Sequence, residues 1–304
     1  MKIDVHAHYV PDGYRAALVR AGHDQPDGMP WIPEWSAVEH VAAMDRLGIA
    51  TSLLSISSPG VCLGDGQTVV GLAREVNEEG RRAVMDHPGR FGLLASLPLP
   101  DADAAVAEIA YCCDRLDVQG FVLLTNVGGT YMSDPSFGPV FTELDRRRAR
   151  VLLHPTSPAC WDRTSFARPR PMLEFLFDTT RTVVDLVLNG TIARHPHLEL
   201  IIPHMGATLA LVADRVQAFA TVLAPTVDVL ADLGRLHFDT AGYGGPRQLN
   251  ALLALTTLEH LHYGSDFPFT PEAIAAAAVE RMDQVESLVV MLRANTARLF
   301  ATDS

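Results

Sequence analysis

The chain has 304 residues, of which 48% are hydrophobic, and acidic residues outnumber basic ones by 36 to 24, for a net charge of −12. This balance argues against nucleic acid or an anionic membrane as a partner, because both require clustered positive charge. We therefore expect the partner to be a small-molecule substrate. The first residues show neither a signal-peptide pattern nor an apolar run long enough to span a bilayer, so we expect a cytoplasmic protein with one domain over residues 1–304.

The few cysteines and the single lysine exclude several kinds of site. Cys62, Cys112, Cys113 and Cys160 show no paired CxxC spacing, so we expect small core residues rather than a disulfide framework or a zinc knuckle. Lys2 is the single lysine, and it lies at the start of the first predicted strand. A Schiff-base mechanism requires a lysine in the pocket, which this chain does not offer.

Eight short runs rich in β-forming residues alternate with longer stretches of helical character. This alternation is typical of βα units around a parallel sheet, and eight units in about 300 residues predict a (β/α)₈ TIM barrel. No Gly-rich phosphate motif follows the first run, as a Rossmann domain would require. The predicted strands are Lys2–His6, Thr51–Ser57, Phe91–Ser96, Gly120–Thr125, Val151–His154, Leu198–Pro203, Leu236–Thr240 and His260–Ser265.

Two long loops interrupt the predicted helices. Pro11–Pro33 follows strand one and Thr156–Pro171 follows strand five. Loops after barrel strands form the rim of the active site, so both are candidate substrate lids. The predicted helices include Ala37–Leu47, Val70–His87, Ala102–Leu116, Phe137–Arg148 and Leu173–His195.

The strongest chemical signal is His6-Ala-His8 at the end of the first strand. Residues two apart on a strand point to the same face, so both imidazoles can reach one ion. An HxH pair alone is weak evidence, because many such pairs are surface or core histidines. Its weight comes from the other strand ends.

Three more predicted strands end in side chains that can bind a metal or a proton, namely His154, His204 and Asp266. Barrel enzymes carry out their chemistry at this C-terminal mouth. Taken alone, each residue is equally well explained as a cap at the start of a loop or, for the histidines, as a buried side chain with its hydrogen bonds satisfied. Their joint placement favours an active site. The other histidines receive no role: His23, His40, His87, His195 and His197 fall in predicted loops or helices, His237 and His260 near strand starts, and His262 inside strand eight.

Three imidazoles and a carboxylate predict one divalent ion held by His6, His8, His154 and Asp266, with a position open to water or substrate. Zn²⁺ is the first expectation. His204 is either a ligand in place of Asp266 or an acid/base group beside the ligands, and we favour the second role.

These residues carry a family resemblance that runs from Met1 to about Phe300. The set resembles the decarboxylase branch of the amidohydrolase superfamily, which includes aminocarboxymuconate semialdehyde and hydroxybenzoate decarboxylases. Other segments, such as Met44-Asp-Arg-Leu-Gly-Ile and Thr179-Thr-Arg-Thr, are similar to the 6-methylsalicylate decarboxylase-like group. The motifs that match the branch are His6-Ala-His8, His154-Pro155, His204-Met-Gly206 and Gly264-Ser-Asp266-Phe-Pro268.

The resemblance implies one Zn²⁺ or Mn²⁺ per chain and a homodimer or larger homo-oligomer. The dinuclear sites of this superfamily need a carboxylated lysine, and Lys2 would lie at the wrong end of its strand. Arg215 matches an arginine that, in aminocarboxymuconate semialdehyde decarboxylase, binds substrate carboxylate in a neighbouring subunit's site. An earlier arginine of that relative has no counterpart in Gly28-Met-Pro-Trp-Ile-Pro, which favours a monocarboxylate substrate.

We therefore expect a metal-dependent, non-oxidative decarboxylase of a small aromatic or unsaturated carboxylic acid, such as a 6-methylsalicylate-like hydroxybenzoate. Asp266 or metal-bound water would protonate the ring carbon, with His204 supporting it. Several aromatic residues and arginines are candidates for the substrate pocket, although residues of these types occur in the core or in salt bridges at least as often as in pockets. These candidates are Arg215, Trp161, Phe267 and Arg181, together with Trp31, Trp35, Phe269 and Arg170.

Two other functions remain open. The same ligands suit a hydrolase of a lactone, amide or ester, and family likeness rather than spacing favours decarboxylation. A catalytically silent metal-binding protein is the third reading, against which His204 argues, since a structural site needs no fifth polar group. Ser57, Ser58 and Asn126 lie at strand ends, where they contact substrate or cap helices, and no Gly-x-Ser-x-Gly motif accompanies them.

Overall fold

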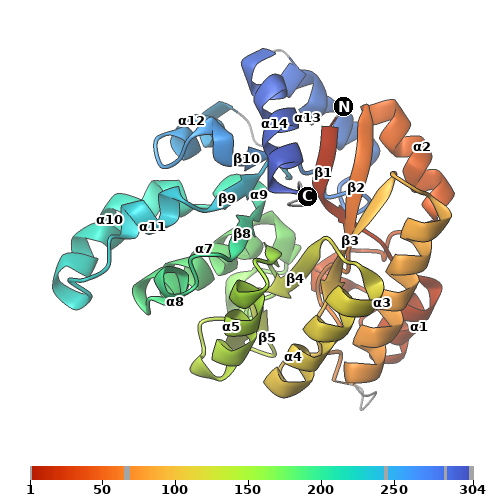
Figure 1. The fold of residues 1–304 in the computed structure, drawn as a ribbon, viewed down its shortest axis with the longest axis horizontal. Helices are drawn as coiled ribbons and strands as arrows, with labels where there is room; N and C mark the ends of the chain where they lie inside the picture. Colours follow the sequence, from red (N-terminus) through yellow and green to blue (C-terminus); the bar gives the residue numbers. More distant parts are fainter. Residues whose placement is uncertain (1, 65–68, 243–245, 284–285, 301–304) are drawn as a thin grey trace.

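The computed structural model describes residues 2–64, 69–242, 246–283 and 286–300, and within them it confirms the predicted (β/α)₈ TIM barrel. Eight parallel strands follow one another around the sheet in chain order, with helices on the outside (Figure 1). The strands are β1 (Lys2–His8), β2 (Ile49–Ser55), β3 (Phe91–Ser96), β4 (Gly120–Leu124), β7 (Arg150–His154), β8 (Glu199–Ile202), β9 (His237–Asp239) and β10 (Leu261–His262).

The barrel closes through the segment that follows β10. Val5 N–H donates to Tyr263 O (2.9 Å), and His8 N–H donates to Phe267 O (2.8 Å). β10 is shorter than the predicted strand His260–Ser265, because beyond His262 the pairing with β1 consists of isolated bridges. Closure therefore brings the residues after β10 beside the histidines of β1.

Two hydrophobic clusters lie on opposite faces of the sheet. The larger one fills the space between strands and helices, and the smaller one lies inside the barrel. Leu93 belongs to the outer cluster and Leu94 to the inner one, as the two-residue period of a strand requires. The strand residues of the inner cluster are Val5, Leu53, Leu94, Leu152 and Ile201.

The helices agree with the predicted ones apart from their ends. The predicted helix Leu173–His195 divides at Gly190 (φ 75°), and only the first part of Ala102–Leu116 is α-helical, because Cys112–Leu116 forms a π-turn. The longer helices are α1 (Asp12–Arg20), α2 (Ala37–Leu47), α3 (Val69–Asp86), α4 (Ala102–Tyr111), α5 (Gly138–Arg146), α7 (Glu174–Leu188), α10 (Leu209–Leu223), α12 (Pro246–Leu253), α13 (Glu272–Asp283) and α14 (Glu286–Leu299). The shorter ones are α6 (Trp161–Thr164), α8 (Thr191–Arg194), α9 (Pro203–Gly206) and α11 (Val229–Gly234).

The two insertions after β1 and β7 meet above the barrel mouth. The first contains α1, so it is less irregular than expected, and the second contains α6. A 3₁₀ turn at Pro26–Gly28 in the first packs against a 3₁₀ turn at Arg170–Met172 in the second. The small hairpin of β5 (Asn126–Val127) and β6 (Thr130–Tyr131) was not predicted.

Only part of the expectation for the cysteines holds. Cys112 is buried, Cys62 and Cys113 are partly buried, and Cys160 is exposed, because it lies in the second insertion just before α6. Within the described residues all four are free thiols. No described helix combines the length and the hydropathy needed to cross a membrane.

Candidate active site

Two histidines of β1 form the base of the site. β1 has a register shift between Asp4 and Ala7, where an advance of three residues along β1 pairs with an advance of two along β2. His6 and His8 are both fully buried, and their Nε2 atoms lie 3.1 Å apart. An irregularity of this kind re-aims side chains, and it allows Val5 to join the inner cluster while the neighbouring His6 faces His8.

The hydrogen bonds of the three histidines fix their tautomers. His6 Nδ1 lies 2.8 Å from Asp239 Oδ2, His8 Nδ1 lies 3.2 Å from Ser55 O, and His154 Nδ1 lies 2.7 Å from Pro155 O. A carboxylate and carbonyl oxygens can only accept, and the Ser55 hydroxyl, 3.0 Å from His8 Nδ1, donates to Ala7 O. Each Nδ1 is therefore the donor, and each Nε2 is left to bind a proton or a cation. Partners of this kind orient histidines that bind metals.

Asp266 completes a set of four side chains. One ligand atom from each of His6, His8, His154 and Asp266 lies within 4.8 Å of the others. The lone pairs of His6 Nε2 and His8 Nε2 face each other at 3.1 Å, an arrangement that a shared proton or cation must stabilise. The structure thus brings together the four predicted ligands, and their donor set fits one divalent cation.

Electrostatics favour a cation at this point. Burial opposes the charged form of Asp266, but the nearby imidazoles of His204, His8 and His6 hold its pKa well below the usual range. Burial also opposes protonation of His6, but the charge and hydrogen bond of Asp239, with the charges of Asp266 and Asp4, together outweigh burial and raise the pKa of His6 to about 9. Burial lowers the pKa of both His8 and His154. The site therefore places an ionised carboxylate and a proton-binding imidazole, His6, beside two imidazoles that burial keeps neutral.

Asp266 reaches the site because of the turn after β10. Its φ is 58°, its N–H donates to His6 O (2.8 Å), and its Oδ2 accepts from Thr270 Oγ1 (3.0 Å). Gly264 permits the close approach, since a Cβ there would lie 3.0 Å from the Cβ of His6 and 3.1 Å from Cγ of Asp239. Aspartate tolerates the left-handed region better than most residues, which suits it to this turn.

Asp239 at the end of β9 links the ligands to His204 and was missed from the sequence. Its Oδ2 accepts from His6 Nδ1, and its Oδ1 accepts from the N–H groups of His204 (3.0 Å) and Ala241 (2.9 Å). Its place at the end of the seventh predicted strand was the available signal. Asp4, also missed, is fully buried and accepts from Ser265 Oγ (2.5 Å).

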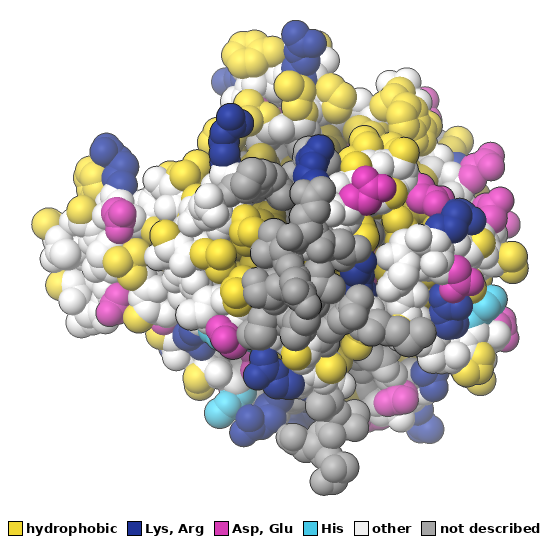
Figure 2. Space-filling model, turned by 90° about the horizontal axis from the view of Figure 1, so that it is seen from above, with side chains coloured by type: hydrophobic (Ala, Val, Ile, Leu, Met, Phe, Trp, Pro, Cys, Tyr) yellow, Lys and Arg dark blue, Asp and Glu magenta, His cyan; other side chains and the backbone are white. Residues whose placement is uncertain are grey.

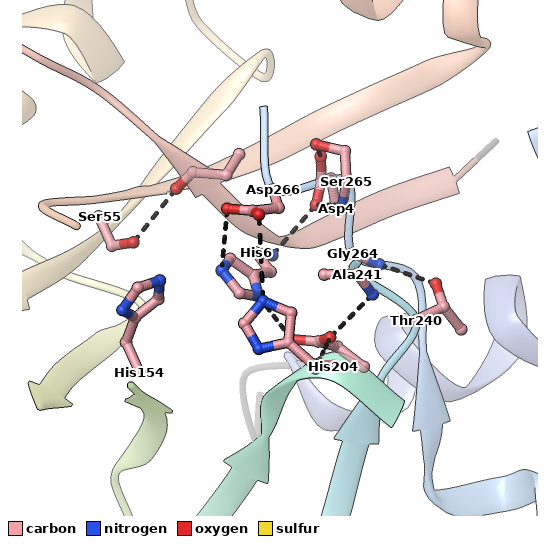
Figure 3. A network of polar contacts seen from close by, with 12 residues as sticks. Asp4, His6, Ser55, His154, His204, Thr240, Ala241, Gly264, Ser265 and Asp266 are labelled. Atoms are coloured by element: carbon pink, nitrogen blue, oxygen red, sulfur yellow. Dashed lines mark hydrogen bonds and ion pairs between the residues drawn. The ribbon is translucent and has the colours of Figure 1, made fainter. Parts of the chain in front are cut away.

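His204 lies beside the ligands rather than among them. Its backbone is left-handed (φ 55°, ψ 49°), and Gln248 Nε2 donates to its carbonyl oxygen (2.9 Å). Its Nε2 lies 4.0 Å from Asp266 Oδ2. Its Nδ1 is buried and has no hydrogen-bond partner in the described part of the chain. Figure 3 shows the ring on the Asp266 side of the cluster, a position suited to proton transfer.

A cavity of about 410 Å³ opens from His154, His204 and Asp266. Both insertions contribute to its wall, the first through Asp27 and the second through Pro171. No lysine or arginine is among the described residues that line it. The cavity is otherwise largely apolar, with Met29, Met172, Phe175, Leu176, Phe269 and Ile274 in its wall.

The residues expected to bind substrate lie mostly elsewhere. Phe267 packs on His40, with ring centroids 4.8 Å apart, whereas Phe269 lines the cavity and contacts His8 (5.5 Å). Trp161 lines a separate cavity of about 280 Å³. The turn at Asp266 shifts which of the two phenylalanines faces the mouth.

The expected arginines are also outside the cavity lining. Arg181 Nη1 donates to Tyr131 OH (3.1 Å) and lies 3.3 Å from the buried carboxylate of Asp178. Arg215 is exposed on α10, where its guanidinium lies 5.3 Å from the centre of the Phe219 ring. Neither therefore reaches the cavity of its own chain in this structure.

Two relatives of known name align along most of the chain. Decarboxylase yanB of Aspergillus niger is 34% identical over 303 residues, covering 93% of this chain and 81% of that protein. The 6-methylsalicylic acid decarboxylase acuB of Aspergillus aculeatus is 34% identical over 283 residues, covering 89% and 85%.

Solved structures agree in fold. A crystal structure described as amidohydrolase II has a TM-score of 0.94 at 35% identity and covers 99% of both chains. A dihydroxybenzoic acid decarboxylase from Polaromonas with bound manganese has a TM-score of 0.83 at 21% identity, covering 98% of this chain and 96% of that one. The amidohydrolase family model matches residues 3–301. The chain therefore belongs to the amidohydrolase family, as its motifs had indicated.

Proposed function

We propose that this protein is a metal-dependent, non-oxidative decarboxylase of a small hydroxybenzoate-like acid. The observation that carries the proposal is the convergence of His6, His8, His154 and Asp266 at a cavity whose described lining has no lysine or arginine. A substrate carboxylate would thus find its positive partner at the four ligands. The 6-methylsalicylic acid decarboxylase among the relatives supports this choice of reaction.

One divalent cation per chain is part of the proposal. When bound, it supplies positive charge that holds a carboxylate and a neighbouring phenolic oxygen and stabilises developing negative charge. Zn²⁺ suits a donor set of three imidazoles and a carboxylate. The manganese in the Polaromonas decarboxylase makes Mn²⁺ the alternative.

The chain's own residues supply the proton and the surface on which the ring packs. The ring carbon that bears the carboxylate takes a proton from the pair formed by Asp266 and His204, whose nearest atoms lie 4.0 Å apart. The bond to the carboxylate then breaks, carbon dioxide leaves, and the electron pair restores aromaticity. Phe175 and Phe269 line the cavity on which the ring would pack, and we propose Phe269 in the role expected of Phe267.

We also propose that a second copy of the chain covers α10. Figure 1 shows α10 and α11 projecting from the barrel, and in Figure 2 this projection lies at the left. Its apolar side chains are strongly exposed, with Leu211 at 75%, Val222 at 79% and Leu223 at 76%. Exposed apolar patches commonly mark interfaces. Arg215 on the same helix would then approach the partner's cavity, and light scattering of the wild type and of Leu223→Asp tests this assembly.

Metal analysis coupled to a carbon dioxide assay tests the function. Purified protein is loaded with Zn²⁺ or Mn²⁺ and incubated with salicylate, 6-methylsalicylate and related hydroxybenzoates. We expect one ion per chain and carbon dioxide release that His6→Ala and Asp266→Ala abolish. Hydrolysis of a lactone with no carbon dioxide from any acid would replace this proposal with the hydrolase reading.

A further inference from the structure

Asp27 is a second acidic side chain in the cavity, separate from the four ligands. It lies in the turn of the first insertion with a left-handed backbone (φ 54°) and is 92% buried, with an exposed fraction of 8%. It lines the same cavity as Asp266. The ligands come from the strand ends and Asp27 from the loop above them, so any molecule that fills the cavity contacts both regions.

The hydrogen bonds of Asp27 come from the other insertion. Ser157 Oγ donates to Asp27 Oδ1 (2.5 Å), and Arg170 Nε donates to Ser157 Oγ (3.0 Å). The guanidinium of Arg170 stacks over the Trp161 ring at 4.2 Å. The arginine therefore reaches Asp27 through a hydroxyl rather than by a direct ion pair within the described residues.

The carboxylate of Asp27 keeps unused hydrogen-bonding capacity. Within the described part of the chain one donor, Ser157 Oγ, reaches it, whereas a carboxylate has roughly four acceptor positions. Met29 and Met172 lie in the same wall and offer no donor. A carboxylate that borders the cavity and has few donors around it favours a ligand that brings a hydrogen-bond donor to this point and disfavours a ligand that brings a second anion.

We propose that Asp27 is a specificity-determining residue that selects acids with a neutral donor, a hydroxyl or amino group, on the part of the ring away from the reacting carboxylate. It rejects acids with a second carboxylate at that position. This inference rests on the proposed function for the identity of the ligand. It goes further by naming which substituent the loop region of the cavity accepts.

The test compares substituents rather than overall activity. Hydroxybenzoates that carry a hydroxyl or a carboxylate at each further ring position are measured with the metal-loaded wild type, Asp27→Asn and Ser157→Ala. For each pair, carbon dioxide release gives the ratio of kcat/KM, and calorimetry gives the ratio of dissociation constants. Asparagine tolerates the left-handed backbone and still accepts from Ser157, so Asp27→Asn removes charge with little change of shape.

We expect the wild type to prefer the hydroxyl acid by on the order of 100-fold at one ring position, and Asp27→Asn to reduce that preference at least tenfold. Ser157→Ala keeps the carboxylate and should leave the ratio within about twofold. An unchanged ratio in Asp27→Asn at every position, or an equal change in Ser157→Ala, would overturn the inference. If no acid releases carbon dioxide, the proposed function fails, and the calorimetric ratio still decides the role of Asp27.

Discussion

Two groups of histidines lie at opposite ends of the same barrel, and only one has the arrangement of a metal site. At the mouth, His6, His8 and His154 direct their Nε2 atoms toward Asp266. At the base, His237 begins β9 and His262 ends β10, and their rings are 5.0 Å apart. Proximity of imidazoles is therefore common to both groups and does not distinguish them.

The partners of the ring nitrogens make the difference. Each Nδ1 at the mouth donates to an oxygen, which leaves the Nε2 lone pairs free to converge. At the base, His237 Nδ1 pairs with His262 Nε2 (2.9 Å) and His237 Nε2 with Glu199 Oε2 (2.8 Å). Both nitrogens of His237 are engaged within the protein, so the base forms a hydrogen-bonded chain where the mouth forms a binding site.

The largest expected effect comes from removing one histidine at each end. His6→Ala should lose bound metal and reduce kcat by about 10³-fold or more, since the cation contributes several kcal/mol to charge stabilisation. His237→Ala should keep one ion per chain and wild-type kcat. Metal analysis and the carbon dioxide assay on both variants check this, and loss of metal in His237→Ala would remove the distinction between the two ends.

Replacement of His204 tests the residue beside the ligands. We expect His204→Asn to keep its metal and to lose about 10²- to 10³-fold in kcat, because it removes a proton-transfer group and no ligand. The matched change at the base is His260→Asn, whose Nδ1 bonds Gly234 O (2.9 Å) far from the cavity. Steady-state kinetics with metal analysis decide the point, and a metal-free His204→Asn would make His204 a ligand instead.

Replacing the carboxylate that bonds a histidine in each group should have a smaller effect, which is measured on metal binding. Asp239→Asn should weaken metal binding by about 10- to 100-fold, because Asp239 orients His6 and fixes its tautomer. Glu199→Gln changes the corresponding partner of His237 and should leave metal affinity unchanged. Competition with a metal chelator measures both, and equal affinities in the two variants would show that Asp239 does not position the ligand.

Strand ends made the convergence of the four side chains predictable from the sequence. His6, His8, His154 and Asp266 lie where a barrel gathers its strands, so the pattern of eight βα units was enough to bring them together. The same reasoning placed the histidines of the base away from the mouth, which the structure confirms for His237 at the start of β9.

Residues positioned by turns could not be predicted in this way. Left-handed backbones at His204 and Asp266 set where the following side chains point, so Phe269 rather than Phe267 lines the cavity. Asp239 differs, because its place at the end of a strand was a usable signal, but its bonds to His6 of β1 and to the backbone of α9 are long-range contacts that no local pattern encodes. Asp27 faces the cavity because two insertions meet, and that contact links residues 130 positions apart.

The smallest expected effect is on the pH dependence of stability at the base. Burial, followed by the charges of His237, His260 and Arg298, holds the pKa of His262 well below its ordinary value of 6.5. The unfolded chain therefore binds a proton at this residue below about pH 6.5 while the folded chain does not. The contribution of His262 to stability is therefore complete above about pH 6.5. As pH falls further, the free energy of unfolding decreases by up to about 1.4 kcal/mol per pH unit because of this residue.

His262→Asn removes this group while leaving the histidines of the mouth in place. Urea unfolding of metal-free wild type and His262→Asn between pH 7.5 and 4.5 should show a smaller loss of stability on acidification in the variant. Because both proteins carry the same mouth, the difference between their slopes isolates the base. Equal slopes would mean that His262 binds a proton in the folded chain as readily as in the unfolded one, and burial would then not hold its pKa down.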